Sequence, residues 1–155
     1  MPPTPEGNDP QAWHRYFAIE ANNRAWGLAA GTRTPAQDRE LLDAAHAAAF
    51  HWDVAGEDLH RARATLLLAE AHALLGLGPS ALAYATEVRD FFAGREAPDW
   101  EVAFVHTVLA HAAAADGDAA LHASAYAAAR AALDAVADPE DKAIVLETFE
   151  QVPKP

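Results

Sequence analysis

Histidine is the residue type most suited to metal binding in this sequence, since the chain has eight histidines and no cysteine. A helical zinc site needs two histidines at i and i+4, which puts both rings on one face. The nearest pairs within single helical segments, His46/His51 and His106/His111, are five residues apart. Five residues turn a helix by about 140°, so these rings point in different directions. We therefore predict no metal and no other cofactor, with the histidines packed between helices.

A metal-dependent enzyme is the alternative interpretation of the histidines. Asp43 and His46 form one imperfect copy of the Glu-x-x-His pattern that di-iron bundles use twice. A three-histidine helical-bundle enzyme of the damage-inducible type would need single histidines from several helices to meet. The sequence contains no nucleophile motif, glycine-rich phosphate loop or dinucleotide fingerprint. We therefore predict no catalytic residue and favour a protein that is not an enzyme.

Seven helices must position any site, because capping residues, prolines and glycines divide the chain into seven segments with helical apolar periodicity. No segment shows the alternation that is typical of a strand. Residues 1–8 are Pro-rich and are predicted to be a disordered tail. A single all-helical domain is predicted over residues 9–152. Its helix pairs cover about 9–55, 58–93 and 98–137, and a capping helix follows at 139–151, with Asp58 as the expected N-cap of the third helix.

The predicted third helix, residues 59–75, carries apolar residues on two opposite sides, separated by narrow polar seams. A helix that is apolar nearly all round is usually buried between neighbours. The next helix, residues 80–93, gathers its apolar residues on one side only. The alternation predicts inner helices that are each followed by an outer helix.

An Ala-His-Ala signature recurs at residues 45–47, 71–73 and 110–112. The last two copies precede glycine turns at Gly76 and Gly117, which are 41 residues apart. Together with the small Ala69, Ala110 and Ala81, these features resemble tetratricopeptide repeats. The spacing exceeds the usual 34 residues, and the Trp-x-x-Leu-Gly motif is absent. The resemblance implies an all-α, right-handed stack of antiparallel helical hairpins that binds proteins or peptides.

In stacks of this family the inner helices line a concave groove. Aligning Gly76 with the family's turn glycine implies that Arg63 and Glu70 lie on that surface, as do Leu66 and Ala73. The matching positions of the fifth helix are Phe104, Thr107 and His111, and Asn23 is a mid-helix amide of the first helix. The predicted binding residues are therefore Arg63, Glu70, Phe104, Thr107, His111 and Asn23.

Purely structural roles remain as alternatives for several of these side chains. Arg63 and Glu70 would then pair with adjacent helices, while Asn22 and Asn23 would hydrogen-bond to a neighbouring helix. The same glycine alignment places His72 at a position where the family packs a core aromatic residue. We predict His72 to be structural.

Net charge limits the partners, because 11 basic residues against 23 acidic ones give a formal charge of −12. A chain this acidic lacks the patch of basic residues that binding to nucleic acid or to an anionic membrane requires. No uncharged apolar run is long enough to span a bilayer, and residues 1–8 do not resemble a signal peptide. We expect a soluble cytoplasmic protein, from a GC-rich bacterium judging by its alanine and arginine usage. Its partner would be a protein or peptide, or a second copy of the chain in a homo-oligomer.

Overall fold

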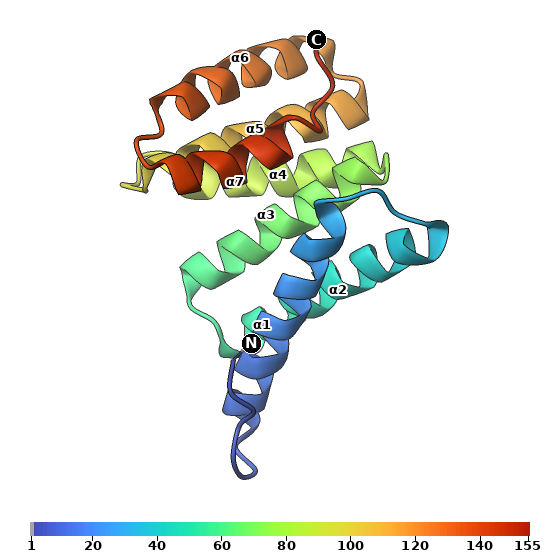
Figure 1. Cartoon of the computed structure of the whole chain (residues 1–155), viewed down its shortest axis with the longest axis vertical. Coiled ribbons are helices and arrows are strands. Elements are labelled where there is room, and N and C mark those ends of the chain that lie inside the picture. Colours follow the sequence, from blue (N-terminus) through green and yellow to red (C-terminus); the bar gives the residue numbers. More distant parts are fainter. Residues whose placement is uncertain (1) are drawn as a thin grey trace.

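The computed structural model describes residues 2–155, which form seven α-helices and no β-strand (Figure 1). The all-α, seven-helix prediction is confirmed. The helices are α1 (Pro10–Ala29), α2 (Pro35–Ala55), α3 (Asp58–Leu74), α4 (Gly78–Phe92), α5 (Asp99–Asp116), α6 (Ala119–Ala135) and α7 (Pro139–Phe149).

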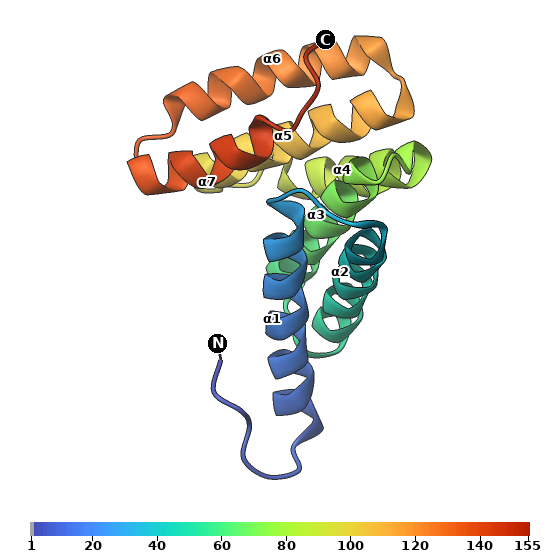
Figure 2. The same cartoon turned by 45° about the vertical axis from the view of Figure 1, so that its right-hand side comes forward.

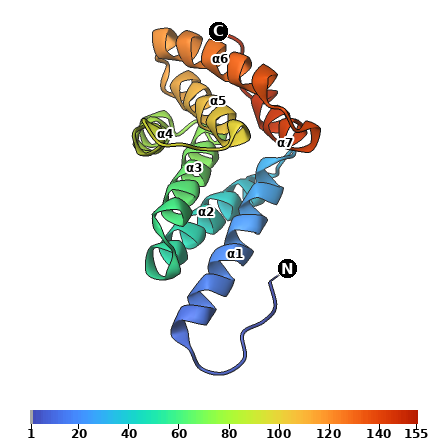
Figure 3. The same ribbon diagram turned by 90° about the vertical axis from the view of Figure 1, so that its left-hand side faces the viewer.

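Each helix packs on the next one along the chain, and the odd-numbered helices also contact one another in order. Helices α1 and α2, α3 and α4, and α5 and α6 form hairpins, and α7 packs on α5 and α6. Contacts between α1 and α3, α3 and α5, and α5 and α7 make the odd-numbered helices a continuous inner row. Figures 2 and 3 show α3 between the α1–α2 hairpin and the helices that follow it. Every residue from 66 to 73 is buried, as expected for a helix with neighbours on both sides.

Polar side chains cap the starts of four helices, α1, α2, α6 and α7. Thr34 and Gln37 form a capping box at the start of α2, and Gly117 ends α5 with a φ of 81°. The prediction of Asp58 as N-cap of α3 is wrong. Glu57 holds that position, and its backbone N–H donates to Nδ1 of His60 at 3.1 Å. Asp58 instead accepts a hydrogen bond from Arg61 at 2.8 Å, which fixes it within the first turn.

The start of α4 lies against the end of α5. Helix α4 begins at Gly78, two residues before the expected Ser80. A Cβ atom at Gly78 would lie 2.5 Å from both the carbonyl oxygen of Ala115 and the Cα of Asp116. Only glycine permits this approach of two backbones, so Gly78 sets how closely consecutive hairpins stack.

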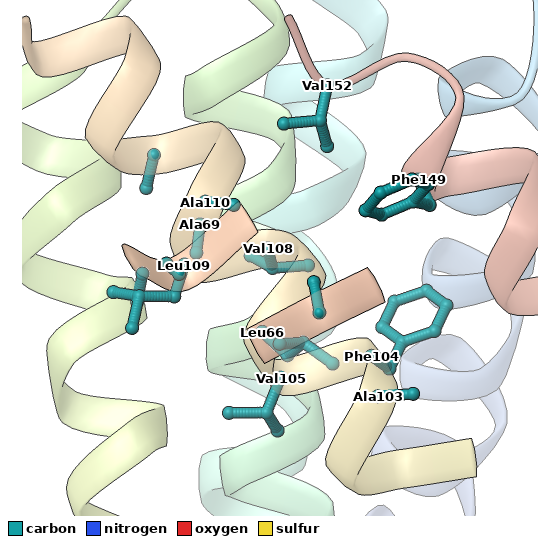
Figure 4. Packing of buried hydrophobic residues seen from close by; sticks show 14 of the residues in the cluster. Leu66, Ala69, Ala103, Phe104, Val105, Val108, Leu109, Ala110, Phe149 and Val152 are labelled. Carbon is teal, nitrogen blue, oxygen red and sulfur yellow. The ribbon is translucent and has the colours of Figure 1, made fainter. Parts of the chain in front are cut away.

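Two apolar clusters form the core, and α3 belongs to both of them. One face of α3 contributes Leu66 and Ala69 to the larger cluster, which includes residues of α4, α5, α6 and α7 (Figure 4). The opposite face contributes Leu67 and Leu68 to the cluster shared with α1 and α2. Packing on two faces explains why α3 has only narrow polar seams.

Residues 2–9 precede the first helix and contain no regular structure. The indole N–H of Trp13 donates to the carbonyl of Gly7 at 3.0 Å, which attaches this segment to α1. The predicted disordered tail includes Met1, which lies outside the described residues. Within residues 2–155, no helix combines the length and the apolar character that crossing a membrane requires.

Candidate binding site

A cavity of about 310 Å³ opens on the inner row, where α1, α3, α5 and α7 converge. Its volume lies at the lower end of the range of small-molecule and side-chain pockets. Residues of all four odd-numbered helices and the positions directly after them line it: Asn22, Trp26, Ala29, Ala30, Arg63, Leu66, Glu70, Trp100, Glu101, Phe104, Ile144, Glu147, Thr148 and Gln151.

Aromatic side chains form much of the cavity wall. Trp26 of α1 meets Phe104 of α5 edge to face, with ring centroids 5.2 Å apart. Trp100 lies at the start of α5, and the guanidinium of Arg63 sits over its ring, 5.6 Å from the centroid. Leu66 of α3, about one turn from Arg63, also lines the cavity. The wall therefore offers flat apolar surfaces with a few charged groups among them.

Arg63 and Glu101 form a two-pronged ion pair at one end of the cavity. Nε of Arg63 donates to Oε1 of Glu101 at 2.7 Å, and a terminal nitrogen donates to Oε2 at 3.1 Å. The hydrogen bond that Arg63 donates to Glu101 raises the pKa of Arg63. Glu101 is 1% exposed, so Arg63 supplies the charge that compensates its burial.

Glu70 and His111 form a second polar pair, two turns further along α3. The Nδ1–H of His111 donates to the Glu70 carboxylate, with N–O distances of 2.9 and 3.1 Å to the two oxygens. Glu70 is fully buried among protein atoms, and His111 is 6% exposed. Glu70 lines the cavity, whereas His111 lies behind it.

Of the six predicted binding residues, Arg63, Glu70 and Phe104 line this cavity. Arg63 and Glu70 do not pair with each other. Each pairs with α5 instead, as the structural alternative proposed, while still facing the cavity. Their role in binding remains a prediction.

Thr107, His111 and Asn23 lie outside the cavity lining. The hydroxyl of Thr107 is buried and donates to the carbonyl of Ala103 at 2.8 Å, so it serves its own helix. Asn23 is exposed, because one residue turns a helix by about 100° and it is Asn22 that faces the cavity. Neither amide hydrogen-bonds to a neighbouring helix within the described residues.

The sequence reasoning missed the aromatic pair Trp26 and Trp100 and the contribution of α7. Trp100 shares a helical face with Phe104, so the wheel of the fifth helix already contained this signal. Glu147 of α7 reads as part of a solvated acidic face and is indeed exposed, yet it lines the cavity. No local pattern shows that α7 covers one end of the inner row, because this depends on how the chain turns after α6.

His72 is buried, as predicted, and lies between α2 and α4. Its Nδ1–H donates to the carbonyl of Leu68 at 2.8 Å, and its ring centroid lies 5.3 Å from that of His46 and 5.2 Å from that of Tyr84. Burial, and secondarily the neighbouring His72, lowers the pKa of His46. Among residues 2–155, no three histidine, aspartate or glutamate side chains gather in a metal-ligand arrangement. The metal-enzyme alternative therefore gains no candidate site from this part of the chain.

Comparison of the chain with models of protein families, with curated proteins and with solved structures finds no match.

Proposed function

We propose that this protein is a peptide- or protein-binding module of the tetratricopeptide-like kind, with the inner-row cavity as its binding site. The observation that carries this proposal is the convergence of α1, α3, α5 and α7 on one aromatic-lined cavity. Hairpin stacks expose such an inner row along a concave surface, and they use it to hold extended partners.

The chemistry of the lining supports a side chain as the occupant. Apolar surface from Trp26, Leu66 and Phe104 provides burial, which contributes about 25 cal/mol per Å². The charged groups among these residues fix the orientation of whatever enters, as in most ligand sites. A cavity of about 310 Å³ holds one or two side chains of a partner, and the rest of the partner would lie along the inner row.

A peptide-capture experiment tests this proposal. Hexapeptide mixtures with blocked termini are passed over the immobilised protein, and the retained peptides are identified by mass spectrometry. The variant Ala30→Trp adds an indole to a residue of the cavity lining and should obstruct the cavity. The matched control is Ala83→Trp, which adds the same group at an exposed position of α4 away from the cavity.

We expect the wild type and Ala83→Trp to retain the same peptides, and Ala30→Trp to lose them. Indole N–H signals in an NMR titration should locate the site, because Trp26 and Trp100 line the cavity whereas Trp13 and Trp52 do not. Peptides that bind Ala30→Trp as well as the wild type, or a wild type that retains none, would contradict the proposal.

Self-association is a second candidate, favoured by the free end of the α1–α2 hairpin. Phe17 and Phe50 are 45% and 62% exposed there, and Val54 of α2 is 42% exposed. Large exposed apolar side chains that lie together often mark an interface. Light scattering coupled to size-exclusion chromatography measures the mass in solution. A dimer that Phe50→Ser converts to a monomer would support this candidate, and a wild-type monomer at all concentrations would exclude it.

A further inference from the structure

The two buried carboxylates of the cavity are unequally satisfied. A carboxylate has two oxygens with about four acceptor positions. Glu101 accepts two N–H groups from Arg63, one on each oxygen. Glu70 is more deeply buried, but its two oxygens share the single N–H on Nδ1 of His111. Glu70 therefore keeps unused acceptor positions, and it lines the cavity.

The charges around the cavity favour a positive occupant. Three carboxylates line it, those of Glu70, Glu101 and Glu147, against the single guanidinium of Arg63. Arg63 is committed to Glu101 by two hydrogen bonds, so Glu70 keeps only the ring of His111 as a partner, and Glu147 has no cationic partner among the lining residues. A carboxylate or phosphate of a ligand would meet this negative charge, whereas an ammonium or guanidinium group would offset it.

The aromatic wall is suited to the same occupant. The cavity already holds one cation against an indole, since Arg63 lies over the ring of Trp100. Trp26, Phe104 and Leu66 provide further aromatic and apolar surface. Lysine and arginine have long aliphatic stems that pack on such surfaces while the charged head reaches a polar partner.

We propose that the cavity binds a lysine or arginine side chain of a peptide, with the charged head directed at the carboxylate of Glu70 and the stem packed against Trp26 and Phe104. This inference rests on the proposed function and specifies the chemistry of the bound residue. It makes Glu70 the recognition residue and His111 the group that holds its carboxylate in place. Arg63 and Glu101, which are paired with each other, remain part of the cavity lining.

The test uses blocked hexapeptide mixtures that differ only in one fixed position, occupied by lysine, arginine, glutamine or glutamate. Retention is measured on the wild type, on Glu70→Gln and on Glu150→Gln. Glutamine at position 70 keeps an acceptor for the His111 N–H but removes the charge. Glu150→Gln makes the same change in net charge at an exposed position outside the cavity lining.

We expect the lysine and arginine mixtures to be retained about tenfold more than the glutamine mixture by the wild type and by Glu150→Gln. Tenfold corresponds to about 1.4 kcal/mol, which is within reach of one hydrogen bond to a charged group. Glu70→Gln should abolish the preference. A preference that persists in Glu70→Gln, or stronger retention of the glutamate mixture, would overturn the inference.

A second measurement keeps the inference testable if Glu70→Gln does not fold. The best-retained lysine peptide is resynthesised with norleucine, which keeps the stem and removes the ammonium group. The norleucine peptide should bind the wild type about tenfold more weakly, and equal affinity would overturn the cation assignment.

The outcomes also separate this inference from the proposed function. Neutral peptides that bind as well as cationic ones, and are lost in Ala30→Trp, would leave the binding module intact and remove the cation assignment. Retention of no mixture at all would overturn both.

Discussion

Replacing Arg63 by methionine should destabilise the protein, because it leaves the Glu101 carboxylate buried without its partner. The two hydrogen bonds to Glu101 measure 2.7 and 3.1 Å, and Glu101 is 1% exposed. Methionine keeps an unbranched apolar stem next to Trp100, so the variant removes the charge more than the packing.

The exposure of the two side chains determines the magnitude. Removing one partner of a fully buried pair costs about 3–5 kcal/mol. The Arg63 side chain is 43% exposed, so water can partly solvate Glu101 in the variant. We therefore expect the free energy of unfolding to fall by about 2–3 kcal/mol. At about 2–4 °C per kcal/mol for a chain of this size, Tm should drop by about 4–12 °C.

Far-UV circular dichroism during thermal and urea unfolding measures this effect, and Arg24→Met is the matched control. Arg24 pairs with Glu40 at 2.6 Å, but both side chains are well exposed, at 60% and 43%. Exposed pairs contribute little, so Arg24→Met should leave Tm unchanged within error. The double variant Arg63→Met with Glu101→Met should recover much of the lost stability, because it removes both charges together.

Equal, small shifts for Arg63→Met and Arg24→Met would refute the reasoning that burial makes the Arg63 pair important. A double variant less stable than Arg63→Met alone would show that the cost arises from lost packing and not from the unpaired carboxylate.

Three further perturbations test other parts of the structure. Gly78→Ala should lower the free energy of unfolding, measured in urea, by roughly 1–3 kcal/mol, because the added Cβ would meet the backbone of α5. Gly27→Ala is the control: open space surrounds Gly27, so this variant should raise the free energy of unfolding by up to about 1 kcal/mol. His72→Ala should cost roughly 1–3 kcal/mol, since it removes a buried ring and the hydrogen bond to Leu68, and an unchanged Tm would contradict this. Burial lowers the pKa of His106, so at mildly acidic pH the unfolded chain binds a proton that the folded chain does not. The urea midpoint of the wild type should therefore fall as the pH drops from about 7 to about 5. The midpoint of His106→Gln should fall less over the same range.

The order and type of the helices could be predicted because each helix carries its own signals. Capping residues such as Thr34 and Asp138, and the turn glycine Gly117, act within a few residues of their position in the chain. The two apolar faces of α3 likewise predict its neighbours on both sides. The predicted N-cap of α3 is wrong by one residue because Glu57 and Asp58 are both acidic. Only their hydrogen bonds, between Glu57 and His60 and between Asp58 and Arg61, distinguish them.

The site could be predicted only in part, because it depends on distances between helices. Helical wheels place Arg63, Glu70 and Phe104 on inner faces, and these residues line the cavity. The partners of the two charges, Glu101 and His111, lie 38 and 41 residues away in sequence. No wheel of a single helix connects residues so far apart. The wheel also could not show which side chains of one helical face reach the cavity: Phe104 lines it, whereas Thr107 does not.

Helices α1 and α7 both line the cavity, but their backbones do not approach each other closely. Both supply lining residues, yet within the described chain no Cα atom of one lies within 8 Å of the other. They are connected only through α3 and α5, so the gap between Trp26 and Glu147 depends on the angles at which successive hairpins stack. A small rotation at either hairpin interface would therefore widen or narrow the cavity. An occupant that touches both helices would therefore favour one curvature of the stack.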